Sequence, residues 1–179
     1  IEARATFVAA DFTDPDAVRN LAAATRDWAA GGLDLLLNNA GGLFGEGQLV
    51  NGGIEKTFHV NHLAPYLLTA ELLAPLRPGA RVVTTASAAH RGATLDLDRV
   101  RDTSDYSGMG AYGHSKLANI LFATELARRL DAAGRDVTSN SIHPGFVPGS
   151  RFGRFLPGPL SGLFRLIDWL PGPASVADG

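Results

Sequence analysis

Short apolar runs alternate with longer helical patterns along this chain, and that alternation limits the possible folds more than any other feature. The runs that read as strands cover residues 6–10, 33–37, 81–86 and 137–142. The helical patterns between them cover residues 15–30, 54–76 and 110–132. Regular alternation of strands and helices predicts an α/β fold, with a parallel sheet and helices on both of its faces.

Polar or turn-forming residues stand at the carboxyl ends of all four predicted strands. They are Asp11, Asn38, Ser87 and the tripeptide His143-Pro144-Gly145. Because parallel strands end at one edge of their sheet, ligands of such folds bind there. We therefore expect these four positions to border one shared cleft.

Composition and charge exclude several classes of protein. The chain is 45% hydrophobic and 19% charged, as expected for one globular domain over residues 1–179. Its net charge of -2 comes without a basic block, so we expect no nucleic-acid partner. There is no cysteine to form a disulfide, and no apolar stretch long enough for a membrane span. Cytoplasmic location is the default expectation.

Tyr112 and Lys116 are four residues apart in a helical pattern, so their side chains share one face. A phenol has a pKa near about 10, too high for acid–base work at neutral pH, and a neighbouring ammonium lowers it. The alternative is an ordinary surface pair. The chain has only two lysines, Lys56 and Lys116, which favours a specific role for the second.

Two further side chains have a chemical and a plain structural interpretation. Ser87 can donate a hydrogen bond to a substrate oxygen, or it can simply begin a loop. Asn61 precedes Pro65 by four residues, and proline has no N–H to donate to the Asn61 carbonyl. We expect a kink there and a carbonyl free to hold a water, unless Asn61 is a solvated residue beside an incidental proline.

The remaining polar clusters are less specific. The small residues and amides of Asn38-Asn39-Ala40-Gly41 would let a flat ligand approach the backbone, or they form an ordinary turn. His59 and His62 are three apart, but no third ligand lies at metal-binding spacing. We therefore expect no metal site.

Together these residues resemble the short-chain dehydrogenase/reductase family from Asp11 to about Ser150. The matching motifs, in family order and spacing, are N-N-A-G at 38–41, Asn61, Ser87, Y-x-x-x-K at 112–116 and P-G at 144–145. Residues 88–92 and 111–119 look like the retinol-dehydrogenase and protochlorophyllide-reductase-like branch. The resemblance implies a Rossmann-like, doubly wound fold and an oxidoreductase that uses NADP or NAD.

The resemblance also implies a catalytic tetrad. Tyr112 would exchange the proton with the substrate oxygen, and Lys116 would lower the phenol's pKa and bind the nicotinamide ribose. Ser87 would orient the substrate oxygen, and Asn61 would hold a water linked to Lys116. Besides Tyr112 and Lys116, the implied cofactor contacts are Asp11, Phe12 and Val60 at the adenine, Asn38, Ala40 and Gly41 near its ribose, and Pro144, Gly145 and Val147 at the nicotinamide.

One departure from the family concerns its first βαβ unit, whose Gly-rich turn holds the pyrophosphate. The sequence opens at what resembles the third strand, so we expect a fragment of a longer enzyme. The strands beside the missing one would then expose apolar faces and unpaired edges. The alternative is a non-catalytic relative that uses the fold for binding or assembly.

The substrate is the least constrained part of the prediction. We expect a small carbonyl or alcohol compound, and the apolar segment 146–179 suggests a lid over a lipophilic one. An equally good interpretation of that segment is a helix packed on the sheet or a contact between subunits of a homo-oligomer.

Overall fold

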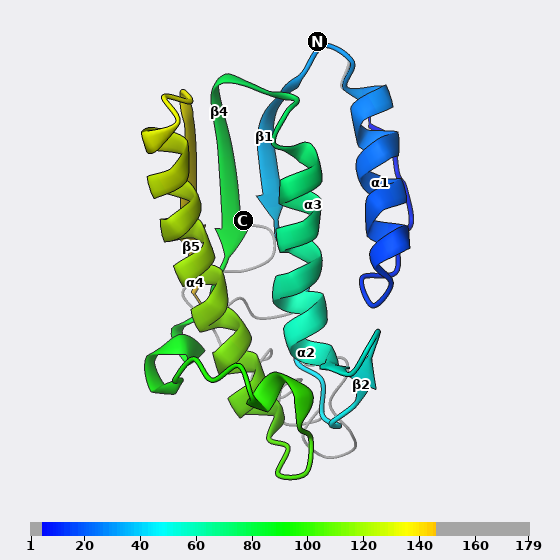
Figure 1. Ribbon diagram of the computed structural model, residues 1–179, viewed down its shortest axis with the longest axis vertical. Coiled ribbons are helices and arrows are strands. Elements are labelled where there is room, and N and C mark those ends of the chain that lie inside the picture. Colours follow the sequence, from blue (N-terminus) through cyan, green and yellow to red (C-terminus); the bar gives the residue numbers. More distant parts are fainter. Residues whose placement is uncertain (1–4, 146–179) are drawn as a thin grey trace, which may run out of the picture.

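The computed structural model describes residues 5–145, which form an α/β fold around a three-stranded parallel sheet (Figure 1). The strands are β1 (Leu33–Asn38), β2 (Leu49–Val50), β3 (Ile54–Glu55), β4 (Leu76–Thr85) and β5 (Val137–Ile142). The helices are α1 (Pro15–Trp28), α2 (Lys56–Phe58), α3 (Ala64–Leu72) and α4 (Gly108–Ala132), with the π-helical turn η1 (His59–Leu63) and the 3-10 turns η2 (Ala88–Gly92) and η3 (Arg99–Arg101). The sheet has the order β1-β4-β5, and β2 and β3 form a separate hairpin.

Helix α1 begins where its sequence predicts. Asp14 is the N-cap, and its carboxylate accepts a hydrogen bond from the Asp16 backbone N–H at 2.9 Å. Pro15 occupies the first turn, where its missing N–H costs no hydrogen bond. Val18 and Ala22, one turn apart, are fully buried, so this face of the helix lies against the core.

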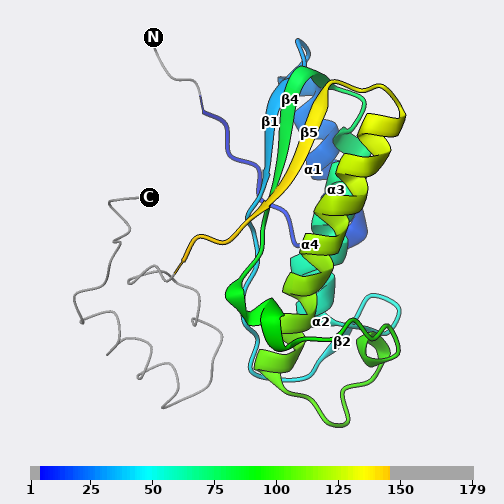
Figure 2. The same ribbon diagram turned by 90° about the vertical axis from the view of Figure 1, so that its left-hand side faces the viewer.

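All three long helices lie on one face of the sheet (Figure 2). The core between them joins Val18 of α1, Leu72 of α3, Val82 of β4 and Leu130 of α4. On the other face, Leu35 and Leu37 are 56% and 53% exposed. The parallel α/β sheet is as predicted, but within residues 5–145 no helix covers that second face.

The strand predicted at residues 6–10 is wrong. This segment has no ladder partner, and Phe7 and Val8 are 90% and 43% exposed. A strand needs a neighbour to pair its backbone groups, and within the described residues β1 has only β4 beside it. Within residues 5–145, the other edge of β1 is unpaired, and its Leu35 and Leu37 side chains are exposed.

The single helix predicted over residues 54–76 is divided. Residues 54 and 55 pair with β2, and helical structure begins only at Lys56. The Glu55 carboxylate caps it by accepting the N–H groups of Thr57 and Phe58 at 2.7 and 2.8 Å. Helix α3 ends at Leu72, and Leu76 already belongs to β4.

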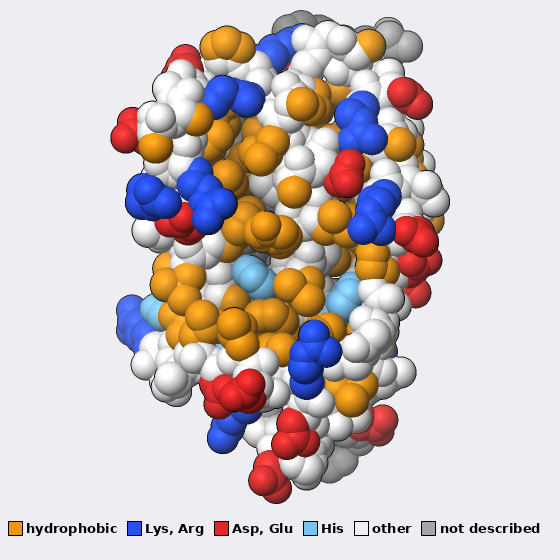
Figure 3. Space-filling view, in the orientation of Figure 1, with side chains coloured by type: hydrophobic (Ala, Val, Ile, Leu, Met, Phe, Trp, Pro, Cys, Tyr) orange, Lys and Arg blue, Asp and Glu red, His pale blue; other side chains and the backbone are white. Residues whose placement is uncertain are grey.

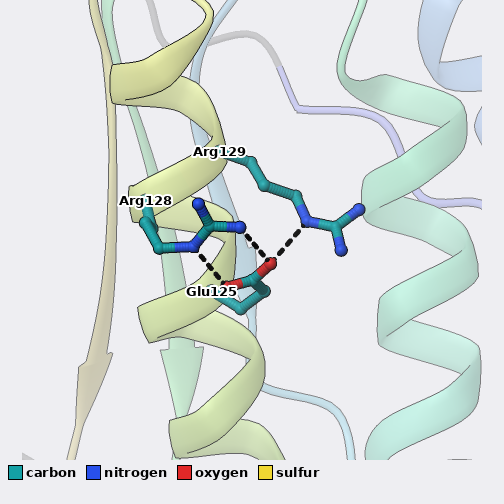
Figure 4. Close-up of polar contacts among 3 residues, drawn as sticks. All are labelled: Glu125, Arg128 and Arg129. Carbon is teal, nitrogen blue, oxygen red and sulfur yellow. Dashed lines mark hydrogen bonds and ion pairs between the residues drawn. The ribbon is translucent and has the colours of Figure 1, made fainter.

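Helix α4 is the longest element and follows its prediction closely. Ser107 caps it, and ion pairs support its C-terminal half. There Glu125 binds Arg128 and Arg129, with oxygen–nitrogen distances of 2.7 Å to each Nε (Figure 4). Hydrogen bonds from Arg128 and then Arg129 lower the pKa of Glu125 to about 2.

Apolar side chains gather along the face between α3 and α4, with histidines among them (Figure 3). A cavity of about 360 Å³ lies in this α3–α4 groove, and residues of both helices, of η1 and of the segment before η3 line it. Its wall includes Phe58, His62, Tyr66, Leu97 and Phe122. Within the described part of the chain, no helix is both long and apolar enough to cross a bilayer.

Candidate active site

The three parallel strands end at one edge, and the predicted site residues follow directly. Asn38 of β1 is in register with Thr84 of β4, and Thr85 is in register with Ile142 of β5. The loop after Asn38, Ser87 and the Pro144-Gly145 turn therefore start at the same edge, as the strand-end argument predicted.

Tyr112 and Lys116 share one face of α4, as their spacing predicted. They are not a surface pair, because only 7% of Tyr112 and 4% of Lys116 is exposed. The Lys116 ammonium lies 5.5 Å from the centroid of the Tyr112 ring. The structure thus brings a buried phenol and a buried amine together beside the strand ends.

Lys116 carries a buried charge that none of the ion pairs among residues 5–145 neutralises. Its Nζ donates one hydrogen bond, at 2.8 Å, to the carbonyl oxygen of Thr85 at the end of β4. Burial lowers the pKa of Lys116 from 10.5 to about 8. The amine is therefore mostly charged at neutral pH, and two of its three N–H groups have no partner in the described part of the chain.

Burial raises the pKa of the Tyr112 phenol above 10, and a side-chain hydrogen bond with Ser87 partly offsets that rise. The lowering expected from the nearby ammonium is therefore not found. The helix start and the Ser87 turn are close because Gly113 has no side chain. A Cβ there would lie 2.7 Å from the carbonyl oxygen of Ala89. Gly113 thus allows Ser87 and Tyr112 to meet.

The backbone around Asn61 is irregular, as Pro65 predicted, but the irregularity is a π turn. The Ala64 N–H donates to the His59 carbonyl across η1. The Asn61 carbonyl, expected to be free for a water, accepts a hydrogen bond at 3.1 Å from the Asn119 side-chain amide. A carbonyl has two lone pairs, so one acceptor position remains.

The Asn61 side chain is a clamp on the loop after β1. Its Oδ1 accepts the Gly42 N–H at 2.9 Å, and its Nδ2 donates to the Gly42 carbonyl at 3.0 Å and to the Ser115 hydroxyl at 3.1 Å. A Cβ on Gly41 would lie 2.7 Å from Asn61 Oδ1 and 3.9 Å from Lys116 Nζ. A side chain at position 41 would therefore force Asn61 to shift, and Asn61, 1% exposed, fixes the loop beside Lys116.

The predicted cofactor-contact residues fall into two groups. Ala40, Pro144 and Gly145 are exposed at the strand-end edge, and Gly41 lies beside Lys116. Asn38, in contrast, is buried and turned toward α3, where its Nδ2 donates to the Thr69 hydroxyl at 2.8 Å. Its side chain supports the core under the loop, and the backbone after it is what remains accessible.

The residues expected at the adenine differ in their exposure. The exposed Asp11 carboxylate accepts two hydrogen bonds from Thr13, which lower its pKa. Phe12 packs partly against the core, and its carbonyl accepts a hydrogen bond from His59 Nδ1 at 2.9 Å. Val60 is half-buried in the π turn. Val147 and the segment 146–179 lie outside the described residues.

This donor set fits the ribose end of a nicotinamide nucleotide. A charged amine with two unused N–H groups suits a pair of hydroxyls, and Gly41 leaves open backbone beside it. A separate cavity of about 480 Å³ borders the other side of α4, with Tyr106 and His114 in its wall. Its lining includes none of the tetrad, so it is distinct from the candidate active site.

Three buried residues of this site had no role predicted from the sequence. Gly113, Ser115 and Asn119 are exposed by less than 9%, and each makes the contact with another element described above. One feature of the sequence could have identified them. They are small or amide residues within or just after Y-x-x-x-K, on a helix whose later buried residues are Leu and Ala.

Known dehydrogenases are similar to this chain over most of its length. Retinol dehydrogenase 14 from Homo sapiens is 40% identical over 141 residues, which are 76% of this chain and 41% of that protein. Polyprenol dehydrogenase from Mus musculus is 39% identical over 175 residues, 93% of this chain and 51% of that protein. The chain thus spans about two fifths to one half of the length of these relatives.

One solved structure of moderate sequence identity has the same fold as this chain. A short chain dehydrogenase from Burkholderia cenocepacia J2315, crystallised in complex with NADP, superposes with a TM-score of 0.65 at 31% identity. The match covers 94% of this chain and 63% of that one. The family profile described as short chain dehydrogenase matches residues 1–154. The chain therefore belongs to the short-chain dehydrogenase family and has its Rossmann-type fold.

Proposed function

We propose that this protein is an NAD(P)-dependent oxidoreductase that interconverts a lipophilic alcohol and its carbonyl compound, with Tyr112 as the acid and base. The observation that carries the proposal is the buried pair Tyr112 and Lys116 beside the ends of β1 and β4. A protein that only binds or assembles has no use for a buried amine without an ion pair, because burying that charge costs stability.

The bound nicotinamide would supply or accept the hydride. This chain's own residues would handle the proton and the position of the substrate. The raised pKa keeps the Tyr112 phenol protonated at neutral pH, as donation to a carbonyl oxygen requires. The Ser87 hydroxyl would hold that oxygen next to the phenol. Lys116, anchored to the Thr85 carbonyl, would direct its remaining N–H groups to the ribose.

Two similarities support the cofactor and the substrate class. The Burkholderia protein was crystallised with NADP, and the human and mouse relatives are named for retinol and polyprenol, both long apolar alcohols. We therefore propose NADP as the preferred cofactor and a lipophilic primary alcohol or aldehyde as the substrate.

The test is Tyr112→Phe in the full-length protein, with NADPH oxidation by retinal as the assay and NADPH fluorescence as the measure of binding. Loss of the hydroxyl removes the proton donor but little packing surface, so we expect turnover to fall by about 10²-fold or more while NADPH binding stays. The matched control is Tyr66→Phe, because Tyr66 is 51% exposed on α3 and is not one of the four proposed catalytic residues.

Substantial turnover by Tyr112→Phe would show that the phenol is not the proton donor. A wild-type protein that neither binds NADPH nor reduces apolar aldehydes would instead support the non-catalytic alternative. A small water-soluble aldehyde in the same assay tests the substrate class, since we expect it to be the poorer substrate.

A further inference from the structure

Asn119 connects three parts of the molecule that meet at Lys116. It lies on α4 three residues after Lys116 and is 2% exposed. Its Nδ2 donates to the carbonyl oxygens of Asn61 in the π turn, at 3.1 Å, and of Thr85 at the end of β4, at 3.2 Å. The Thr85 carbonyl is also the acceptor for Lys116 Nζ. Asn119 and Lys116 therefore share one acceptor.

The orientation of the Asn119 amide follows from its partners. Both groups facing Nδ2 are backbone carbonyls, which can only accept, so the NH₂ end must point at them. The Oδ1 end then faces His62 Nδ1, at 3.0 Å. His62 must donate in this contact, so its Nδ1 carries the proton. All three hydrogen bonds of the amide are thereby assigned.

His62 belongs to the wall of the α3–α4 groove. Its ring centroid lies 5.0 Å from that of Phe58 and 6.2 Å from that of Phe122. Burial among these rings lowers the pKa of His62, and the hydrogen bond with Asn119 only partly opposes this. The Asn119 amide oxygen requires a proton on His62 Nδ1, and a neutral His62 supplies it in that tautomer. The polar chain thus runs from the groove wall to the catalytic lysine.

We propose that Asn119 is a positioning residue that acts through Lys116, and that His62 supports it by donating a hydrogen bond to the amide oxygen. The inference rests on the proposed function. Without the Asn119 donor, the Asn61 carbonyl would lose its side-chain hydrogen bond in a buried place, where unpaired polar groups are costly. The π turn and the end of β4 would then shift to find new partners. Lys116 would move with the Thr85 carbonyl that anchors it.

Packing alone does not explain an asparagine at this position. After Asn119, the buried side chains of α4 are Ala123, Leu126 and Leu130, all apolar. An apolar side chain at position 119 could be buried equally well and would need no hydrogen-bond partners. The amide is useful only because it holds two carbonyls of different elements at a fixed place beside Lys116.

The experiment compares Asn119→Leu and Asn119→Asp with Leu126→Ala in the full-length protein. Asn119→Asp keeps the shape and the acceptor toward His62 but removes both N–H donors. Leu126→Ala opens a cavity two turns further along α4 and leaves the polar chain intact. We expect kcat for retinal reduction to fall about tenfold or more in both Asn119 variants, with KM changed less than about threefold.

A second readout needs no catalysis. The pKa of Lys116, followed by NMR of isotope-labelled lysine and assigned with Lys116→Met, should move by about 0.5 or more in the Asn119 variants and stay in place in Leu126→Ala. His62→Gln keeps a donor toward Asn119 and should retain more activity than His62→Phe, which has none.

The two hypotheses fail in different ways. If the wild-type protein shows no activity while Asn119→Leu moves the Lys116 titration, the proposed function is wrong and the coupling stands. If the wild type is active but both Asn119 variants match Leu126→Ala in kcat and in the Lys116 pKa, Asn119 is merely structural and the inference is overturned.

Discussion

Replacing Lys116 with methionine should make this protein more stable at neutral pH while it loses activity. The reason is the buried charge, because burial lowers the pKa of the amine from 10.5 to about 8. That difference corresponds to about 3 kcal/mol of unfavourable free energy in the folded state, at about 1.4 kcal/mol for each pKa unit. Methionine fills a similar volume without a charge to bury.

The gain is reduced by the hydrogen bond that is lost. The contact between Lys116 Nζ and the Thr85 carbonyl is worth about 1.5 kcal/mol, as a bond from a charged donor. The carbonyl would still accept from Asn119, so it would not be left unpaired. We therefore expect a net stabilisation of about 1–2 kcal/mol at pH 7, seen as a rise in Tm of about 2–6 °C.

The sign of the pH dependence follows from the direction of the pKa change. A lysine whose pKa is lower when folded costs most below pH 8, and the cost disappears as the pH rises toward 10.5. The advantage of Lys116→Met should thus shrink by about 1 kcal/mol between pH 7 and pH 9. Urea unfolding followed by tryptophan fluorescence measures this, with the cofactor omitted.

Lys56→Met is the control, because Lys56 hydrogen-bonds Gln48 at the exposed surface and should give no such gain. A Lys116→Met protein that is less stable than the wild type at pH 7 would refute the reasoning. So would a gain that stays constant up to pH 9.

Three other expectations follow from the geometry. Gly113→Ala should lower kcat about tenfold or more, since its Cβ would meet the Ala89 carbonyl at 2.7 Å and separate Ser87 from the phenol; unchanged kinetics would contradict this. Gly41→Ala should weaken NADPH binding about tenfold in calorimetry, or ~1.4 kcal/mol, because its Cβ would push on Asn61. The 179-residue chain expressed alone should self-associate in light scattering through the open edge of β1, and a monodisperse, cooperatively melting sample would disprove it.

Features that depend on neighbouring residues were correctly predicted from the sequence. The start of α1 follows from Asp14 and Pro15, and nearly the whole of α4 from its helical pattern. The shared face of Tyr112 and Lys116 follows from their spacing, because an α-helix repeats every 3.6 residues. The meeting of the strand ends was predictable too, since alternating strands and helices give parallel pairing.

The features that the sequence could not determine depend on contacts between residues that are distant in the chain. The run at residues 6–10 has the composition of a strand, but pairing requires a neighbour that local sequence does not reveal. Asn38 turns toward α3 because Thr69, far along the chain, offers it a hydroxyl. The phenol's pKa rises because burial outweighs the other influences on Tyr112, which only the packed structure decides.

The sequence by itself thus determined the α/β alternation, the long helix and the shared face of Tyr112 and Lys116, because periodicity, capping and spacing act within a few residues. Only the tertiary structure decided the π turn's partner, the clamp that Asn61 forms on Gly42, and the shared carbonyl of Lys116 and Asn119. Buried hydrogen bonds pair groups distant in sequence, and their partners are selected by packing.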